Sequence, residues 1–389
     1  MIHCPKCKQT ENINKAGVIR GKQRYFCKSC DLHFTIPEVQ KEAAKRPHHQ
    51  VTIIDIANEL GISKSTVSRA LRGHGDIHEG TRQIVLDLAK QLDYQPNLLA
   101  NALLKSRTNT IGIIVPEFRH YFFPAVIIGA QEILSKAGYN VMICQSDESY
   151  ETEVANVKAL MSSRVDGLLV SVTAQTNNFD HFRAVLRKEV PLVFFNRVCE
   201  ELNTSQVVVD DYAGAFAAVE HLIVQGYRRI AHLAGPTTLQ ISLLRMQGYK
   251  DALQKHGLPF DNELLIHFDL TQDKARIYAN YLLSLPHPPD AIFVINDPTA
   301  IEVMLIAKKR GIKIPQELGI VGFSNDPMSE IIEPNLTTVE QPVGKIGRVA
   351  AQLLLNEINS ELSEWKKEEI ILKTELIERG SSKKILSFK

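Results

Sequence analysis

Hydrophobic positions follow two different periods along the chain. Residues 51–96 carry apolar side chains at helical spacing in three short segments, which predicts three helices. From residue 110 onward, nearly continuous runs of Val, Ile and Leu alternate with amphipathic helical segments, a pattern typical of parallel sheets covered on both faces. The expected strands are TIGIIV, YNVMIC, DGLLVS, PLVFFN, SQVVVD, RRIAHLA, LLIHF, AIFVIN and LGIVGF.

This series of strands is too long for one comfortable sheet, so we predict two α/β lobes that divide near residues 196–210. The 389 residues also exceed one ordinary domain. The expected organisation is a small cysteine module at 1–35, a linker at 36–50, a helical head at 51–96, a connector at 97–108, the two-lobed body at 109–379 and a tail at 380–389.

The net charge of +1 hides an asymmetry along the chain. Residues 1–108 hold 17 Lys and Arg against 10 Asp and Glu, whereas the remaining 281 residues hold 28 against 34. A basic N-terminal quarter on a mildly acidic body is typical of a nucleic-acid-binding protein. No window approaches about 18 uninterrupted apolar residues, and the first residues lack the apolar core of a signal peptide. We therefore expect a cytoplasmic protein with no membrane span.

Four of the six cysteines form two CxxC pairs, Cys4 with Cys7 and Cys27 with Cys30. This spacing matches a zinc ribbon, in which four thiolates surround a structural Zn²⁺. A module this short cannot bury enough apolar surface to fold alone, and structural zinc can supply about 10 kcal/mol of folding free energy. Disulfides or a redox pair are the alternatives, and a reducing cytoplasm disfavours both.

Basic and aromatic residues are interleaved between the two cysteine pairs, in the segment GKQRYFCKSCDLHFT. Two interpretations stay open for Lys22, Arg24 and Lys28 with Tyr25 and Phe26: a solvated hairpin with packing aromatics, or a surface that contacts nucleic acid. The segment resembles the short zinc ribbon at the N-terminus of IS1-type transposase accessory proteins. That resemblance covers only this module and implies DNA contact.

Residues 51–71, VTIIDIANELGISKSTVSRAL, predict a helix-turn-helix. Thr52 is the expected N-cap of the first helix, Gly61 supplies the left-handed turn, and Ser63 caps the second helix. A third helix from Thr81 completes the predicted core, which comprises Ile53, Ile56, Ala57, Leu60, Val67, Ala70, Leu71, Ile84, Val85, Leu88 and Leu92.

The second helix has a polar and basic outer face, which is typical of a helix that enters the major groove. Lys64 and Ser65 are placed to reach base edges, and Arg69 can pair bidentately with a guanine. Three hydroxyl residues suit phosphate contacts, namely Thr52, Thr66 and Ser68. The alternative is a non-binding helical hairpin with solvated charges.

Three stretches together, VTIIDIANELGISKSTVSRAL, YQPNLLANAL and TNTIGIIVP, resemble the lactose-repressor (LacI/GalR) family of bacterial transcription regulators. The resemblance spans roughly residues 51–379. It implies a homodimer that reads a pseudo-palindromic operator in double-stranded DNA. It also implies a body like the type I periplasmic sugar-binding proteins, with an effector between the lobes. The cysteine module is not part of that family's usual layout.

The segment that follows Pro96 is short and apolar, so its helix is marginal in water and needs a partner. By the same resemblance, paired hinge helices lie in the minor groove at the operator centre. Leu103 corresponds to the leucine wedge that unstacks a central base step. The other residues assigned to this contact are Asn97, Leu98 and Ala100. An amphipathic linker helix packed on the body is the alternative.

Candidate effector residues stand at strand ends of the body, where open α/β sheets bind ligands. By resemblance, Phe122 and Phe123 are cleft aromatics and Arg245 is the ligand-clamping arginine. The other candidates are Asn196, Arg197, Asp211, Asn296, Asp297 and Ser324. Each has an alternative: core packing for the two Phe residues, a helix cap or loop position for Asp211, Asn296 and Asp297, and a surface salt bridge for Arg245.

Asn196 and Ser324 stand where many relatives carry Asp, so we expect a less negative cleft. This favours a ligand with its own carboxylate or phosphate, so the expected effectors are a sugar, a sugar acid such as a uronate, or a sugar phosphate.

Motifs of common enzyme classes are absent: there is no P-loop, no GxGxxG after the first strand, no GxSxG and no HExxH. The histidines form no constellation with Cys or Ser. We therefore expect a non-enzymatic, effector-responsive repressor. A transposon-associated zinc-ribbon DNA-binding protein and a sugar-binding α/β enzyme are the alternatives.

Overall fold

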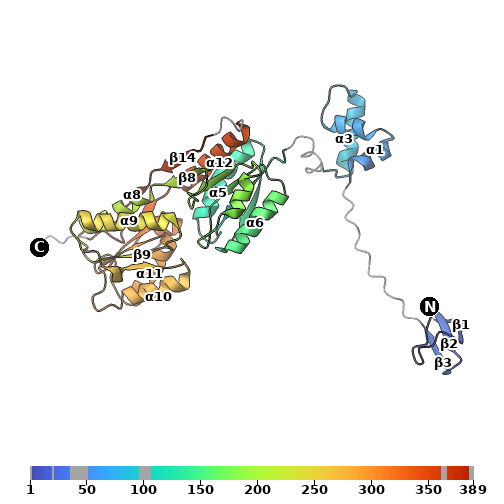
Figure 1. Ribbon diagram of the computed structural model, residues 1–389, viewed down its shortest axis with the longest axis horizontal. Coiled ribbons are helices and arrows are strands. Elements are labelled where there is room, and N and C mark those ends of the chain that lie inside the picture. The colour runs from blue at the N-terminus through green and yellow to red at the C-terminus, as the bar shows by residue number, and fades with distance from the viewer. Residues whose placement is uncertain (1, 20–21, 36–50, 96–106, 361–365, 385–389) are drawn as a thin grey trace. The chain divides into compact units, whose positions relative to one another are not determined.

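The computed structural model of the protein describes residues 2–19, 22–35, 51–95, 107–360 and 366–384 (Figure 1). Contacts divide the chain into two compact units, residues 1–97 and 98–389, and each is described by itself. The first unit contains the cysteine module and the helical head. Within the described residues, no helix is long and apolar enough to cross a membrane.

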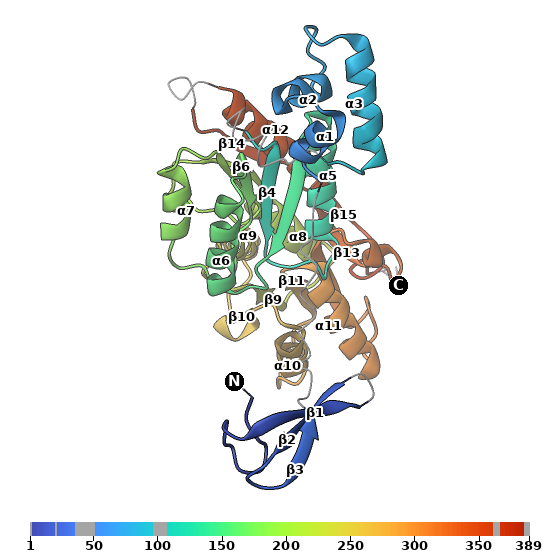
Figure 2. The same ribbon diagram turned by 90° about the vertical axis from the view of Figure 1, so that its right-hand side faces the viewer.

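The cysteine module is a three-stranded antiparallel sheet in the order β1-β2-β3 (Figure 2). Its strands are β1 (Ile13–Ile19), β2 (Lys22–Cys27) and β3 (Leu32–Thr35). Cys4 and Cys7 lie in the loop before β1, Cys27 ends β2, and Cys30 lies in the turn after it. The peptide N–H of Cys4 donates to the carbonyl of Gln9 at 3.0 Å. The sheet therefore brings the two cysteine pairs together at one end.

The head consists of α1 (Ile53–Leu60), α2 (Lys64–Leu71) and α3 (Glu79–Gln91). Its predicted caps are confirmed. Thr52 accepts from the N–H of Ile54 and forms a capping box with Asp55, and Ser63 accepts from the N–H of Thr66. Gly61, at φ 65°, ends α1 in the left-handed region that favours glycine. The buried core is Ile56, Ala57, Val67, Ala70, Val85, Leu88 and Ala89.

One predicted core position of the head is wrong: Ile84 is 57% exposed. On α3, Val85, Leu88 and Ala89 form the buried stripe. At about 100° per residue, the position just before Val85 turns away from that stripe. Ile84 and Val85 are adjacent apolar residues, and helical spacing alone did not show which of them faces the core.

The body contains two six-stranded sheets, each covered on both faces by helices (Figure 1). The first sheet has the order β14-β8-β7-β6-β4-β5 and is parallel throughout. One face packs on α5 (Phe122–Lys136) and α12 (Val343–Asn359), the other on α6 (Tyr150–Ser162) and α7 (Asp180–Leu186). Its strands are β4 (Thr110–Val115), β5 (Asn140–Gln145), β6 (Gly167–Val170), β7 (Leu192–Phe195), β8 (Ser205–Val209) and β14 (Glu369–Leu372).

The second sheet has the order β10-β9-β11-β12-β13-β15, and only β15 runs antiparallel to its neighbour. Helices α8 (Asp211–Val224) and α9 (Gln240–Lys255) cover one face; α10 (Gln272–Leu282) and α11 (Asp297–Lys309) cover the other. Its strands are β9 (Ile230–Ala234), β10 (Leu265–His267), β11 (Ala291–Val294), β12 (Gly319–Ser324), β13 (Thr337–Glu340) and β15 (Glu375–Ile377). Two short 3₁₀ helices, η1 (Asn262–Leu264) and η2 (Pro327–Glu330), complete this lobe.

The chain crosses between the lobes three times, at residues 210, 341–342 and 373–374. The first crossing follows β8, within the predicted boundary. The sequence did not predict that α12 and β14 return to the first lobe, or that β15 then rejoins the second. The strands β13 (TTVE) and β15 (ELI) contain no run of more than two apolar residues, and the apolar run of β14 is only three residues long, so these strands gave a weaker signal than the other nine.

Glycines allow α12 to rejoin the first lobe closely. A Cβ on Gly347 would overlap the backbone carbonyl of Val126 on α5, and a Cβ on Gly129 would overlap the carbonyl of Gly344 on α12. The two helices therefore pack backbone against backbone, and residues far apart in sequence complete one lobe.

Candidate functional site

A cavity of about 1070 Å³ lies between the two lobes, at the carboxyl ends of their strands. Seven of the nine predicted effector residues line it: Phe122, Phe123, Asn196, Arg197, Arg245, Asn296 and Ser324. Asp211 and Asp297 are not among the lining residues. The prediction that the strand ends meet at one cleft agrees with this geometry. Two of the predicted side chains, those of Asp211 and Asp297, contact residues next to the cavity rather than line it.

Arg197 lies on the first-lobe wall with a paired charge. Its Nη1 donates to both carboxylate oxygens of Glu148, at 2.8 and 2.9 Å, and its side chain is only 7% exposed. The guanidinium carbon stands 5.8 Å from the ring centre of Phe123, which in turn packs edge-on against Phe122 at 5.1 Å. Phe123 is buried in the core and Phe122 is half-buried.

Arg245 lies on the second-lobe wall and is buried with its counter-ion. Its Nε and Nη2 approach one oxygen of Asp211 at 2.8 and 2.6 Å, and Nη1 donates to the carbonyl of Ile295 at 2.5 Å. The guanidinium also stacks 3.6 Å from the ring centre of Phe323. Burial raises the pKa of the Asp211 carboxyl, and the charge of Arg245 opposes this.

Two of the alternative interpretations are therefore wrong. Arg245 is 3% and Asp211 is 2% exposed, so their ion pair is buried rather than superficial. Asp211 is not the cap of α8, because the side chain of Asp210 accepts from the N–H of Ala213 at 2.8 Å. Asp211 instead holds the arginine that faces the cavity.

Asn296 and Asp297 follow β11 but serve different purposes. Asn296 caps α11, since its Oδ1 accepts from the N–H of Thr299 at 2.9 Å. Asp297 is fully buried and accepts three hydrogen bonds: from the N–H of Asp326 at 2.7 Å, from Ser329 Oγ at 2.9 Å and from Thr338 Oγ1 at 2.6 Å. Burial raises its pKa to about 6. Asp297 thus fixes the loop that follows Ser324, the last residue of β12.

Sequence reasoning missed Gln341, which lies in the second crossing and lines the cavity. Its side chain is 4% exposed, and its Oε1 has no hydrogen-bond partner among the described residues. A buried acceptor without a partner carries a desolvation cost that a ligand donor would remove. A single Gln after a short strand gives no local sequence signal. Gln341 is found as a cavity residue only because the second crossing places it between the lobes.

Carboxylates outnumber guanidiniums on the cavity wall, so the wall does not carry the positive excess that an anionic ligand would favour. The acidic side chains are Glu117, Asp147, Glu148, Asp269, Asp273, Glu302 and Asp326, against Arg119, Arg197 and Arg245. Arg197 and Arg245 are already paired with carboxylates, and Arg119 lies 3.7 Å from Asp147. No arginine on this wall therefore stands ready, without a partner, for an anionic ligand.

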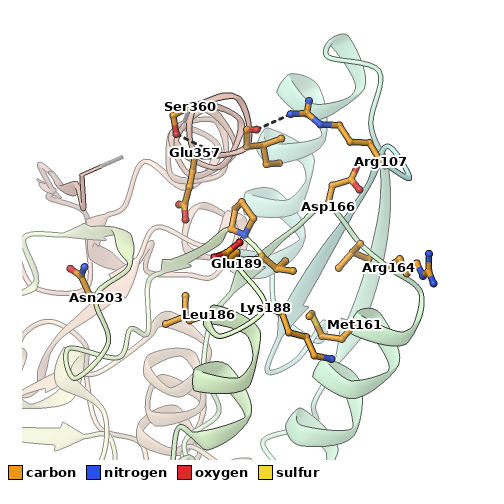
Figure 3. A pocket seen from close by; sticks show the side chains of 14 residues that line it. Arg107, Met161, Arg164, Asp166, Leu186, Lys188, Glu189, Asn203, Glu357 and Ser360 are labelled. Carbon is orange, nitrogen blue, oxygen red and sulfur yellow. Dashed lines mark hydrogen bonds between the residues drawn. The ribbon is translucent and has the colours of Figure 1, made fainter. Parts of the chain in front are cut away.

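A second cavity, of about 800 Å³, lies within the first lobe where the chain enters the body (Figure 3). Arg107 donates to the carbonyl of Ile358 at 2.9 Å, and Asp166 accepts from the N–H groups of Thr108 and Asn109 at 2.8 and 2.7 Å. These bonds anchor the entry strand. The wall carries charges of both signs, with Arg107, Arg164 and Lys188 against Asp166, Glu189 and Glu357.

The predicted DNA-reading face of α2 is exposed at Lys64, Ser65 and Arg69. Lys64 makes no ion pair with described residues, whereas Arg69 pairs with Asp76 at 2.8 Å. The Ser63 hydroxyl contacts those of Ser65 at 2.7 Å and Thr66 at 2.8 Å.

Of the remaining predicted DNA contacts, Ser68 and Thr52 make hydrogen bonds within the head, and the hinge residues are not described. Ser68 Oγ accepts from Arg72 Nη2, and Thr52 Oγ1 donates to Asp55 at 2.8 Å. The predicted hinge contacts Asn97, Leu98, Ala100 and Leu103 lie outside the described residues.

The four N-terminal cysteines form a compact cluster. All six cysteines of the chain are free, and the sulfurs of Cys4, Cys7, Cys27 and Cys30 lie within 4.8 Å of one another. Pairs of these sulfurs are 3.3, 3.6 and 3.7 Å apart. A tetrahedral Zn²⁺ with Zn–S bonds of about 2.3 Å requires sulfurs about 3.8 Å apart, so the cluster fits such an ion.

Comparisons with known proteins cover the head and the body. Residues 52–97 match the family model of bacterial regulatory proteins of the lacI family, and residues 219–382 match that of a periplasmic binding protein-like domain. Neither match includes the cysteine module.

Individual relatives span most of the chain. Catabolite control protein A of Priestia megaterium is 32% identical over 80% of this chain and 93% of its own. The ribose operon repressor of Halalkalibacterium halodurans is 32% identical over 85% and 97%. Among solved structures, a complex of the transcriptional regulator CelR with cellobiose is 28% identical over 85% of this chain and 99% of its own, with a TM-score of 0.65.

Replacing Asp211 with Asn is expected to lower the free energy of unfolding of the body by about 3–5 kcal/mol, because the Arg245 guanidinium stays buried without a counter-charge. Urea denaturation followed by circular dichroism measures this. Glu132→Gln is the matched control, since Glu132 pairs with Arg348 at 3.2 Å on the surface. Equal unfolding midpoints for both variants would show that the buried pair does not stabilise the body.

Proposed function

Because the chain belongs to the lacI family of bacterial regulatory proteins, we propose that it is a cytoplasmic transcriptional repressor whose affinity for operator DNA is set by a sugar bound between the lobes. The observation that carries this proposal is the cleft itself, which combines residues of both lobes on a chain that also carries a helix-turn-helix head. The names of the relatives, which are those of regulators rather than enzymes, support it.

A neutral sugar fits the cleft better than an anionic one. The Gln341 carbonyl can accept from a hydroxyl group, while the paired guanidiniums of Arg197 and Arg245 keep donor hydrogens for hydroxyl oxygens. Phe122 offers an apolar ring on the first-lobe wall of the cavity. The ribose named for one relative's operon and the cellobiose bound to another support this ligand class.

The three crossings between the lobes offer a route by which ligand binding in the cleft could change the affinity for DNA. A sugar held by Arg197 on one lobe and Arg245 on the other favours one relative orientation of the lobes, and the three crossings must accommodate it. Sugar and DNA affinities are then reciprocally coupled, typically by about 1–3 kcal/mol. The sign of this coupling distinguishes induction from co-repression.

We also propose a homodimer. Large apolar side chains are exposed on both lobes: Ile128 on α5 (59%), Ile143 on β5 (45%) and Ile277 on α10 (61%). A dimer interface that covers these side chains would remove their apolar surface from water. A two-fold dimer would present two α2 helices to the two halves of a pseudo-palindromic operator.

For the cysteine module we propose a structural Zn²⁺ held by Cys4, Cys7, Cys27 and Cys30. The ion would crosslink the two loops at the end of a sheet that buries almost no core of its own.

Replacing Lys64 with Ala is expected to weaken binding to an operator selected from random duplex DNA by about tenfold, because the side chain supplies a contact in the groove. Fluorescence anisotropy measures the affinity, and light scattering checks that the variant stays dimeric. Lys90→Ala on α3 is the matched control, since Lys90 is also exposed and makes no ion pair with a described residue. A Lys64→Ala protein that binds as tightly as the wild type would exclude this use of α2.

Replacing Gln341 with Leu is expected to weaken sugar binding by about ten- to a hundredfold, because the ligand hydroxyl loses its acceptor. Calorimetry with ribose, cellobiose, glucuronate and glucose 6-phosphate identifies the ligand class and measures the loss. Gln352→Leu, an exposed position on α12, is the control. Binding of the phosphate or the acid but of neither neutral sugar would contradict the assigned ligand class.

Removal of zinc by a chelator, or Cys7→Ser, is expected to unfold the cysteine module and leave the melting temperature of the body unchanged. Elemental analysis should find one zinc per chain, and limited proteolysis should cut residues 1–35 only after removal. Sub-stoichiometric metal together with a protease-resistant module would rule out a structural ion.

A further inference from the structure

Most of the positive charge of the N-terminal part lies in the cysteine module rather than in the helix-turn-helix. Residues 1–35 hold seven Lys and Arg against two Asp and Glu, a net charge of +5 with neutral cysteines and about +3 with the proposed Zn²⁺ held by four thiolates. The head, residues 51–96, holds five against six, a net charge of −1. The part of the chain that resembles a DNA reader by sequence is therefore not the part with the largest electrostatic attraction for DNA.

Ion pairing increases this difference. In the head, Arg69 pairs with Asp76 and Arg82 with Glu79. In the module, the five cations whose side chains are described make no ion pair with any described residue, and they are Lys6, Lys8, Lys15, Arg24 and Lys28. Their charges are available to an external anion.

The sheet sorts the residues that the sequence interleaves onto two faces. The strand register places Phe26 opposite Asn14 on β1 and opposite His33 on β3, and Arg24 opposite Thr35. The N–H of Lys28 donates to the carbonyl of Asn12 at 3.0 Å, which extends the same register by one pair. Since side chains alternate along a strand, one face carries Asn14, Arg24, Phe26, Lys28, His33 and Thr35. We call it the basic face.

The opposite face has a different character. Lys15, Tyr25 and Phe34 are neighbours across the three strands, and Cys27, on the same face, is fully buried. That face thus carries the small apolar core beside the cysteines. On the basic face, the Phe26 and His33 rings contact each other in a tilted arrangement with their centres 4.5 Å apart, and no element within the described residues of 2–35 covers them.

We propose that the basic face of the module binds the sugar-phosphate backbone of duplex DNA beside the operator. Arg24 and Lys28 neutralise phosphates, and Asn14, His33 and Thr35 donate hydrogen bonds to phosphate oxygens. Such contacts read no sequence, so the module adds affinity and salt dependence while α2 keeps the specificity. The proposal rests on the proposed function only in that the head brings duplex DNA to the protein.

Chain length limits where the module can bind. Residues 36–50 join it to the head, and a chain of this length spans at most about 58 Å. At about 3.4 Å per base pair, the contacted phosphates lie within roughly 17 base pairs of the head. Binding is therefore expected to depend on DNA that flanks the operator.

The test compares full-length wild type with the double variant Arg24→Ala, Lys28→Ala on two probes, a 60-base-pair duplex with the selected operator at its centre and a 20-base-pair duplex of the operator alone. The wild type should bind the longer duplex more tightly, and the double variant should bind both alike. On the longer duplex, the variant should lose about tenfold in affinity at 100 mM KCl, and its log–log salt slope should fall by about 2 per protomer.

Lys15→Ala removes one charge from the opposite face and should behave as the wild type. Zinc content equal to the wild type shows that each variant module is folded. A wild type that gains nothing from flanking DNA overturns the proposal without any variant. With a single-stranded 60-mer as a third probe, a double variant that loses affinity for this strand but not for the 60-base-pair duplex also overturns it. If Lys64→Ala weakens binding while the double variant does not, the module proposal fails and the head's function stands; if neither variant weakens binding, both fail.

Discussion

The buried contact between Arg245 and Asp211 is the interaction on which the architecture of the cleft depends. Asp211 is the first residue after the chain leaves the first lobe, and Arg245 projects from the next helix, so their ion pair fixes α9 to the first crossing. The same guanidinium reaches the carbonyl at the end of β11 and stacks on Phe323 of β12. One side chain therefore connects a crossing, a helix and two strand ends, and it presents to the cavity only those donor atoms that the pair leaves over.

The lobes carry buried charges that shape the cavity from behind. Asp297 holds the loop after β12 through three hydrogen bonds, and Glu148 holds Arg197 on the opposite wall. Because these charges are satisfied inside the protein, they support the proposed neutral sugar more than a ligand with a net charge. The crossings link this chemistry to the rest of the body: the N–H of Asp210 donates to the carbonyl of Leu372 at 2.9 Å, so the first and third crossings lie side by side. A ligand that changes the angle between the lobes has to act on these paired segments.

We propose that DNA binding is divided between the helix-turn-helix and the cysteine module, which the sequence motifs alone do not suggest. The helix-turn-helix has the caps, the turn and the exposed α2 that a groove-reading element requires, yet several of its charges are paired within the head. The cysteine module has little apolar core, but several of its cations make no ion pair with described residues, and Arg24 and Lys28 lie on one face of its sheet. We therefore assign sequence specificity to α2 of the head and non-specific electrostatic affinity to the basic face of the cysteine module.

Short-range features could be predicted from the sequence because they depend on residues a few positions apart. The caps at Thr52 and Ser63, the turn at Gly61, the CxxC pairs and nine strands of the body all have local signals, and the structure contains each of them. The exposure of Ile84, the return of α12 to the first lobe, the partner of Arg245 and the place of Gln341 had no such signal. These were decided by tertiary structure, because each depends on which strands become neighbours in a sheet and on what burial then demands of a charge or an amide that is distant in the chain.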